Sequence, residues 1–148
     1  SSVFGISQYY TSRASAFLRD VIEPAALTGK AVLRKPFTDI NQYLYAPDAG
    51  ESVALAYKLK RNPSHRVFNI SDGKLRGARE MIRTAERAIP GASITITKGA
   101  WAKSRGSHFV PEPFSLRAAR KHLGFKPAWP MKKALAHYAE KVRERAAL

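Results

Sequence analysis

Apolar residues recur at helical spacing near the start of this chain. Five of them lie three or four residues apart and predict the buried face of a helix: Phe17, Leu18, Val21, Ile22 and Ala25. Thr11 and Ser12 are the expected N-caps, and the helix is expected to end before Gly29. Pro24 is expected to bend this helix or to end it early, because proline removes a backbone donor.

Further helices are predicted downstream. One begins near Pro47, ends at Asn62-Pro63 and has an apolar face of Val53, Ala54, Tyr57 and Leu59. Another spans about residues 75–89, with an apolar stripe on one side, and ends at Pro90-Gly91. A short helix is expected over 115–122, before Gly124, and a last helix from Pro130.

Short β-rich runs alternate with these helices. Strands are expected over residues 31–33, 40–45, 66–70 and 93–97. Residues 98–114 have no periodicity, so they are expected to form a long loop, and loops of that length in a compact domain are more often functional than incidental. Strands that alternate with helices predict an α/β fold, and 148 residues fit a single domain over 1–148.

Charge adds information that the periodicity does not give. The chain has 26 Lys and Arg against 11 Asp and Glu, a formal net charge of +15. Such an excess attracts anions: nucleic acid, an acidic membrane surface or a phosphorylated small molecule. The alternative is that an acidic first half normally balances the charge.

Several classes of site are disfavoured by composition. The chain has no cysteine, and its four histidines show no metal-ligand spacing, so no metal site is expected. No apolar run approaches the roughly 20 residues that span a bilayer. No membrane association is expected, and the expected location is cytoplasmic.

Five short motifs follow one another in a specific order. They are Val3-Phe4-Gly5-Ile6, residues 27–32, residues 41–48, residues 66–73 and residues 123–127. In order and spacing they resemble the carboxy-terminal half of the NAD-dependent nucleotide-sugar epimerase/dehydratase family, the extended short-chain dehydrogenases. The resemblance spans nearly all of the chain. Phe125 stands where the family has tryptophan, a conservative change for packing.

The resemblance implies a particular part of an α/β enzyme. It implies the last strand of a Rossmann sheet plus a small α/β substrate-binding lobe, with the N-terminal dinucleotide-binding half absent. The intact protein would use NAD or NADP, and Val3, Phe4 and Gly5 would lie beside the nicotinamide. Its substrate would be a nucleotide sugar or a related small molecule.

The residues that such chemistry requires are not found in this sequence. Dinucleotide binding uses a G-x-G-x-x-G pattern after a strand, and no such pattern occurs. The family's proton transfer uses a Tyr-x-x-x-Lys pair, but Tyr9 and Tyr57 are each followed at that spacing by arginine, which stays protonated. We therefore expect no catalytic residue and no cofactor bound by this chain alone, so that only the intact protein is an enzyme.

Five residues are candidate substrate contacts. Arg105 lies in the long loop, where the family has an arginine that grips a diphosphate, although it could be a solvated loop residue. Tyr43 could pack against a nucleotide or sugar, but a strand aromatic is more often a core residue. Asn41 replaces an arginine of the family motif, and Gln8 and Tyr9 follow the nicotinamide-side loop.

Two functions remain open after these considerations. The favoured one is the substrate-binding half of an NAD(P)-dependent epimerase, dehydratase or reductase, completed by a missing Rossmann half. The alternative is a stand-alone basic module that binds nucleic acid or another polyanion. Nucleic acid is the less favoured partner, because the basic residues are spread over several elements and no RNA-binding motif occurs. Apolar surface that the absent half would cover could also make the chain a homo-oligomer.

Overall fold

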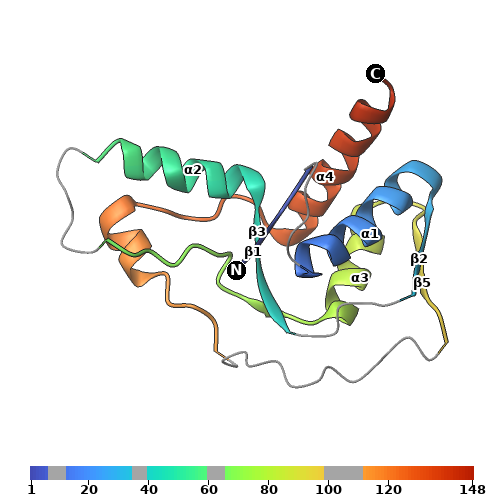
Figure 1. The fold of residues 1–148 in the computed structure, drawn as a ribbon, viewed down its shortest axis with the longest axis horizontal. Helices are drawn as coiled ribbons and strands as arrows, with labels where there is room; N and C mark the ends of the chain where they lie inside the picture. The colour runs from blue at the N-terminus through green and yellow to red at the C-terminus, as the bar shows by residue number, and fades with distance from the viewer. Residues whose placement is uncertain (7–12, 35–39, 60–65, 99–111) are drawn as a thin grey trace.

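A computed structural model shows an α/β fold with two small sheets (Figure 1). It describes residues 1–6, 13–34, 40–59, 66–98 and 112–148. In chain order the elements are β1 Ser2–Phe4, α1 Arg13–Thr28, β2 Lys30–Leu33, β3 Asn41–Tyr45, α2 Ala46–Tyr57, β4 Leu75–Arg76, α3 Ala78–Ala88, β5 Ser93–Ile96, η1 Ala119–Leu123 and α4 Met131–Ala146. The α/β class predicted from the sequence is confirmed.

Each sheet pairs strands that are distant in sequence. The first has the order β1-β3-β4, with β1 parallel to β3 (Val3 opposite Leu44) and β4 antiparallel to it (Arg76 opposite Asn41). The second is the parallel pair β2 and β5, with Ala31 opposite Ile94. Parallel pairs need long crossover connections, which is why helices separate these strands.

The main core lies between three helices and the two sheets. In Figure 1, α1, α3 and α4 lie together on the side of β1 and β3 that faces the second sheet. Their fully buried side chains include Leu18, Ile22, Met81, Leu135 and Tyr138. Each large apolar side chain that is fully buried stabilises the fold by about 1.5–3 kcal/mol, so this cluster is the main source of stability.

A smaller core holds the opposite side of β3. Leu44 packs there with Ala119, Leu123 and Phe125. Partly buried residues of α2 and of the segments 59 and 68–70 complete the cluster. Figure 1 shows α2 and η1 at the end of the molecule away from α1 and α3. This second core fixes η1 and the chain before it against β3.

Three sequence predictions about element boundaries were wrong. Residues 66–70 form no strand. The helix predicted over 75–89 begins only at Ala78, because Leu75 and Arg76 pair with β3 as β4. The helix predicted over 115–122 is mainly a π-helical turn, Ala119–Leu123, which Gly124 ends in the left-handed conformation at φ 68°.

The apolar face predicted for α2 is not buried. Val53 is 69% exposed and Tyr57 is 90% exposed, whereas Asp48 and Ser52 are the buried residues of this helix. Asp48 accepts hydrogen bonds from the backbone nitrogens of Ala128 (2.9 Å) and Trp129 (3.3 Å). A buried carboxylate therefore ties α2 to the chain entering α4.

Pro24 does not end α1, which continues through it to Thr28. Thr11 and Ser12, the expected N-caps, lie outside the described residues.

Among the helices that the structure describes, none is long and apolar enough to cross a membrane.

Candidate functional site

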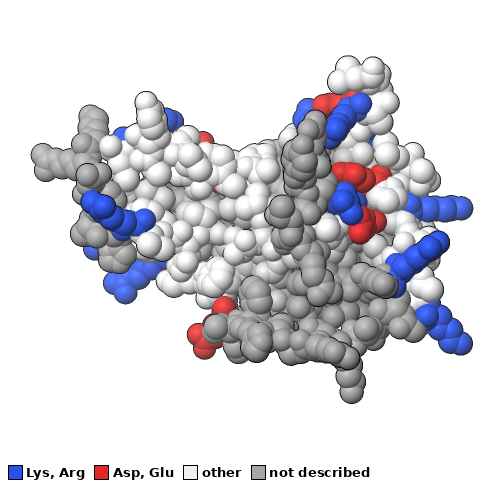
Figure 2. All heavy atoms as spheres, viewed as in Figure 1, with Lys and Arg blue, Asp and Glu red and all other residues white. Residues whose placement is uncertain are grey.

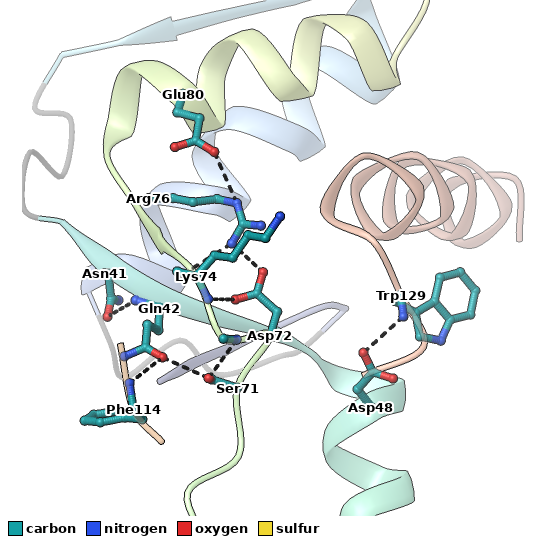
Figure 3. A network of polar contacts seen from close by, with 11 residues as sticks. Asn41, Gln42, Asp48, Ser71, Asp72, Lys74, Arg76, Glu80, Phe114 and Trp129 are labelled. Atoms are coloured by element: carbon teal, nitrogen blue, oxygen red, sulfur yellow. Dashed lines mark hydrogen bonds and ion pairs between the residues drawn. The ribbon is translucent and has the colours of Figure 1, made fainter. Parts of the chain in front are cut away.

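Gln42 joins three segments of the chain at one point (Figure 3). Its side chain is fully buried on β3. The Oε1 atom accepts hydrogen bonds from Ser71 Oγ (2.8 Å) and from the backbone nitrogen of Phe114 (3.1 Å). Ser71 Oγ in turn accepts from the backbone nitrogen of Gly73 (3.0 Å). The turn after residue 70 and the chain after the long loop are therefore both held on β3.

The orientation of the Gln42 amide follows from its partners. The Phe114 nitrogen can only donate, so the atom that faces it must be the amide oxygen. Nε2 is buried and has no hydrogen-bond partner among the described residues. A buried donor without a partner costs about 1–3 kcal/mol, so this nitrogen is a site where a further polar group would stabilise the fold.

Asn41 lies at the start of β3 with its side chain buried. Nδ2 donates to Ser2 Oγ (2.6 Å), and Oδ1 accepts from the backbone nitrogen of Gln42 (2.9 Å). The bond to Ser2 links β1 to β3. The predicted role of Asn41 in substrate contact stays a prediction.

Tyr43 and Phe4 are both part of the main core. Tyr43 is fully buried, and its ring meets that of Phe4 edge to face with 6.4 Å between centroids. Phe4 also packs against Tyr45, at 5.2 Å. Of the candidates for substrate and nicotinamide contact, these two rings therefore face inward in this structure.

The other two candidates for nicotinamide contact lie at the end of β1. Val3 is half exposed, and its carbonyl accepts a hydrogen bond from Ser15 Oγ at 2.7 Å. Gly5 has a φ of 153°, and a Cβ built there would lie 2.9 Å from Ala46 Cβ. Glycine is needed at this position because the backbone of β1 passes so close to the start of α2.

The remaining candidates for substrate contact are Arg105, Gln8 and Tyr9. All three lie outside the described residues. The structure does describe the end of the long loop. The backbone nitrogen of Phe114 bonds to Gln42, which is next to Tyr43 in β3.

Arg76 is a buried cation that the sequence analysis did not single out. Its guanidinium forms an ion pair with Asp72 and another, at 3.3 Å, with Glu80 (Figure 3). Asp72 also accepts from the backbone nitrogen of Lys74 at 3.2 Å. The spacing of residues 72, 76 and 80 was the signal that could have revealed this group. Because the charge of Arg76 is matched by these carboxylates, it stabilises the turn.

Tyr45 is the last residue of β3, and its ring packs with those of His137 and Trp129. Its hydroxyl lies 2.8 Å from His137 Nδ1, and its ring meets Trp129 edge to face at 5.3 Å. Burial, with a smaller effect from the Glu140 charge, raises the pKa of Tyr45 to about 12. Tyr45 therefore keeps its proton near neutral pH and cannot serve there as a general base.

A hollow of about 680 Å³ lies beside the Gln42 junction. Gly73 and Phe114 form part of its wall, and both are held on Gln42, directly or through Ser71. Its basic lining residues are Arg117, Arg120 and Lys121. Their spacing on one short helical segment is the sequence signal for this cluster.

Comparisons with known proteins find solved enzyme structures that share this fold. No protein-family model and no curated protein matches the sequence. The solved structure of RMD from Pseudomonas aeruginosa complexed with NADPH matches with a TM-score of 0.70 at 14% identity, over 97% of this chain and 46% of that one. The fold is that of the carboxy-terminal part of an extended short-chain dehydrogenase.

Two other solved structures support the same assignment of fold. L-threonine dehydrogenase from Phytophthora infestans has a TM-score of 0.72 at 13% identity, over 97% of this chain and 46% of that chain. UDP-glucuronic acid 4-epimerase from Bacillus cereus, in complex with UDP-glucuronic acid and NAD, has a TM-score of 0.67 at 16% identity, over 97% and 43%. This chain thus spans less than half the length of these enzymes.

Proposed function

We propose that this chain is the substrate-binding half of an NAD(P)-dependent nucleotide-sugar epimerase/dehydratase-like oxidoreductase. The observation that supports this most is the extent of the structural match, which takes in 97% of this chain but only 43–46% of each enzyme compared above. The part of those enzymes left unmatched would correspond to a dinucleotide-binding half. The chain alone would not be catalytically competent.

The surface proposed to meet that other half is the outer edge of β1. In the sheet that the structure describes, β1 is an edge strand with β3 as its neighbour. Val3 on this strand and Ile6 just after it are exposed apolar residues. Exposed edge strands are natural sites for the addition of another strand, and burial of these side chains would stabilise the junction.

The described residues fit one side of a cofactor pocket at most. They include no glycine-rich turn at a helix N-terminus, which is the feature that holds a dinucleotide pyrophosphate. NAD(P), which would supply hydride transfer in the intact protein, is therefore assigned to the other half. Val3, Phe4 and Gly5 would border the nicotinamide from this side.

Substrate recognition is the role proposed for this chain itself. Arg105, Gln8 and Tyr9 are proposed as direct contacts. Asn41 and Tyr43 are buried, so they would support the pocket from beneath. The acceptor role of Gln42 would fix the end of the long loop that contains Arg105.

Calorimetric titration with NADH and NADPH tests this division of roles. We expect no binding to the chain alone, and binding once it is combined with the polypeptide that supplies a glycine-rich βαβ unit and a Tyr-x-x-x-Lys pair. Tight, saturable binding of either cofactor to the chain alone would contradict the proposal.

A further inference from the structure

Two open hollows on one end of the molecule share a basic ridge. Ser115, Arg117 and Lys121 line both hollows. The first, of about 680 Å³, is also lined by Arg120, and the second, of about 510 Å³, is also lined by Asn69. In Figure 2, Lys and Arg atoms lie at the end of the molecule that holds η1 in Figure 1. A single ligand could cross the ridge and occupy both hollows.

The positive charge of this ridge is not neutralised by neighbouring carboxylates. Arg117, Arg120 and Lys121 are all exposed. None of them takes part in a salt bridge among the described residues, and no Asp or Glu lines either hollow. Since the whole chain has a net charge of +15, this end adds a local concentration of charge to a general attraction for anions.

The walls of the hollows are partly apolar and aromatic. Phe114 lines the first hollow and is 36% exposed, while the Gln42 oxygen holds its backbone nitrogen. Val67 and His122 line the second hollow, and the His122 ring lies 6.2 Å from that of Phe68. A part-exposed aromatic ring beside cations is the combination on which nucleobases stack.

The geometry points to a binding site for single-stranded nucleic acid at this ridge. Successive phosphates of the strand pair with Arg117, Arg120 and Lys121, and a base stacks on Phe114. The hollows are open, whereas sites for small ligands usually enclose most of the ligand, so an extended strand fits better than a free nucleotide. This activity is separate from the proposed substrate-binding role, because its residues include neither the β1 edge nor Arg105, Gln8 or Tyr9.

Fluorescence anisotropy with labelled oligouridine tests the position of the site. The double variant Arg117→Ala/Lys121→Ala should bind at least about tenfold more weakly at low salt. The slope of log association constant against log salt concentration should become less steep by about 1.4, the value for two lost phosphate contacts. The control pair Lys132→Ala/Arg145→Ala removes the same charge from exposed positions of α4 and should stay close to the unmodified chain. Equal losses in both pairs, or no saturable binding by the unmodified chain, would overturn the proposal.

A second variant tests whether the ligand is a nucleic acid rather than any polyanion. Phe114→Leu keeps every charge but removes the stacking surface, so it should weaken oligouridine binding about tenfold. The same variant should bind inorganic tripolyphosphate, measured by competition, with unchanged affinity. If Phe114→Leu binds oligouridine as tightly as the unmodified chain, the site holds only phosphate charge and the proposal of nucleic acid fails. Circular dichroism of each variant shows whether it is folded.

Discussion

Gln42 accepts a hydrogen bond of 3.1 Å from the backbone nitrogen of Phe114, 72 residues away in sequence. The same oxygen accepts the hydroxyl of Ser71, which holds the backbone of Gly73. One buried amide on β3 thus sets the positions of two segments that line a basic hollow. Both proposals above use this arrangement, because it fixes the backbone of Phe114 at the end of the long loop.

Replacement Gln42→Leu should loosen both segments. It removes one acceptor that serves two donors, so we expect a loss of about 1–3 kcal/mol in the free energy of unfolding. Urea denaturation measures this loss, and hydrogen exchange should become faster at residues 112–116. The control Ser52→Ala removes a single local bond to Ala49 and should leave exchange at 112–116 unchanged. Unaltered exchange in Gln42→Leu would contradict the positioning role.

Replacement Arg76→Met should destabilise the fold strongly. The variant leaves the largely buried Asp72 carboxylate without its guanidinium, and breaking a buried pair from one side costs about 3–5 kcal/mol. Arg19→Ala is the matched control, because its ion pair with Asp20 is exposed and such pairs contribute only about 0–1 kcal/mol. Similar midpoints in urea for the two variants would show that Arg76 is not a structural cation.

Gly5 and Gly50 should respond in opposite ways to alanine. Gly5→Ala requires a side chain at φ 153° and 2.9 Å from Ala46 Cβ, so a loss of about 1–3 kcal/mol is expected. Gly50 lies within α2 with no atom near its missing side chain, so Gly50→Ala should stabilise by up to about 1 kcal/mol. Thermal melts of the two variants measure the contrast. A stabilising Gly5→Ala would mean that β1 does not pass as close to α2 as described.

Stability at high pH should depend on Tyr45. Its pKa is raised from 10.0 to about 12 by burial and by the Glu140 charge, so between these values the unfolded chain loses a proton that the folded chain keeps. The free energy of unfolding should therefore fall as pH rises from about 10 to about 12. In Tyr45→Phe this fall should be smaller, although the variant also loses its bond to His137 and about 1 kcal/mol at neutral pH. Parallel pH slopes for the two proteins would contradict the assignment.

Local periodicity was sufficient to predict most of the fold. The spacing of apolar residues correctly predicted the α1 helix and the strands β2, β3 and β5. The errors came from pairing between distant segments: Leu75 and Arg76 leave the helical pattern to pair with β3, while residues 66–70 form no strand despite their β-rich composition.

The candidate site was less accessible to sequence reasoning. The link between Gln42 and Phe114 crosses 72 residues, and no local pattern reveals such a contact. Asn41 and Tyr43 were identified from their place in a motif, but whether their side chains face solvent or the core depends on β1 and α4, which pack against that strand only in the folded chain. By contrast, the spacing of Asp72, Arg76 and Glu80 is a local signal that could have been used.

Native mass spectrometry of the protein purified from its own cells tests the central claim most directly. If this chain is the substrate-binding half of a redox enzyme, its residues should occur in an assembly well above 16.4 kDa that contains a dinucleotide-binding half, either in the same polypeptide or in a second one. NAD or NADP should be released when that assembly is denatured. A species of 16.4 kDa, free of any other polypeptide and of cofactor, would contradict the account.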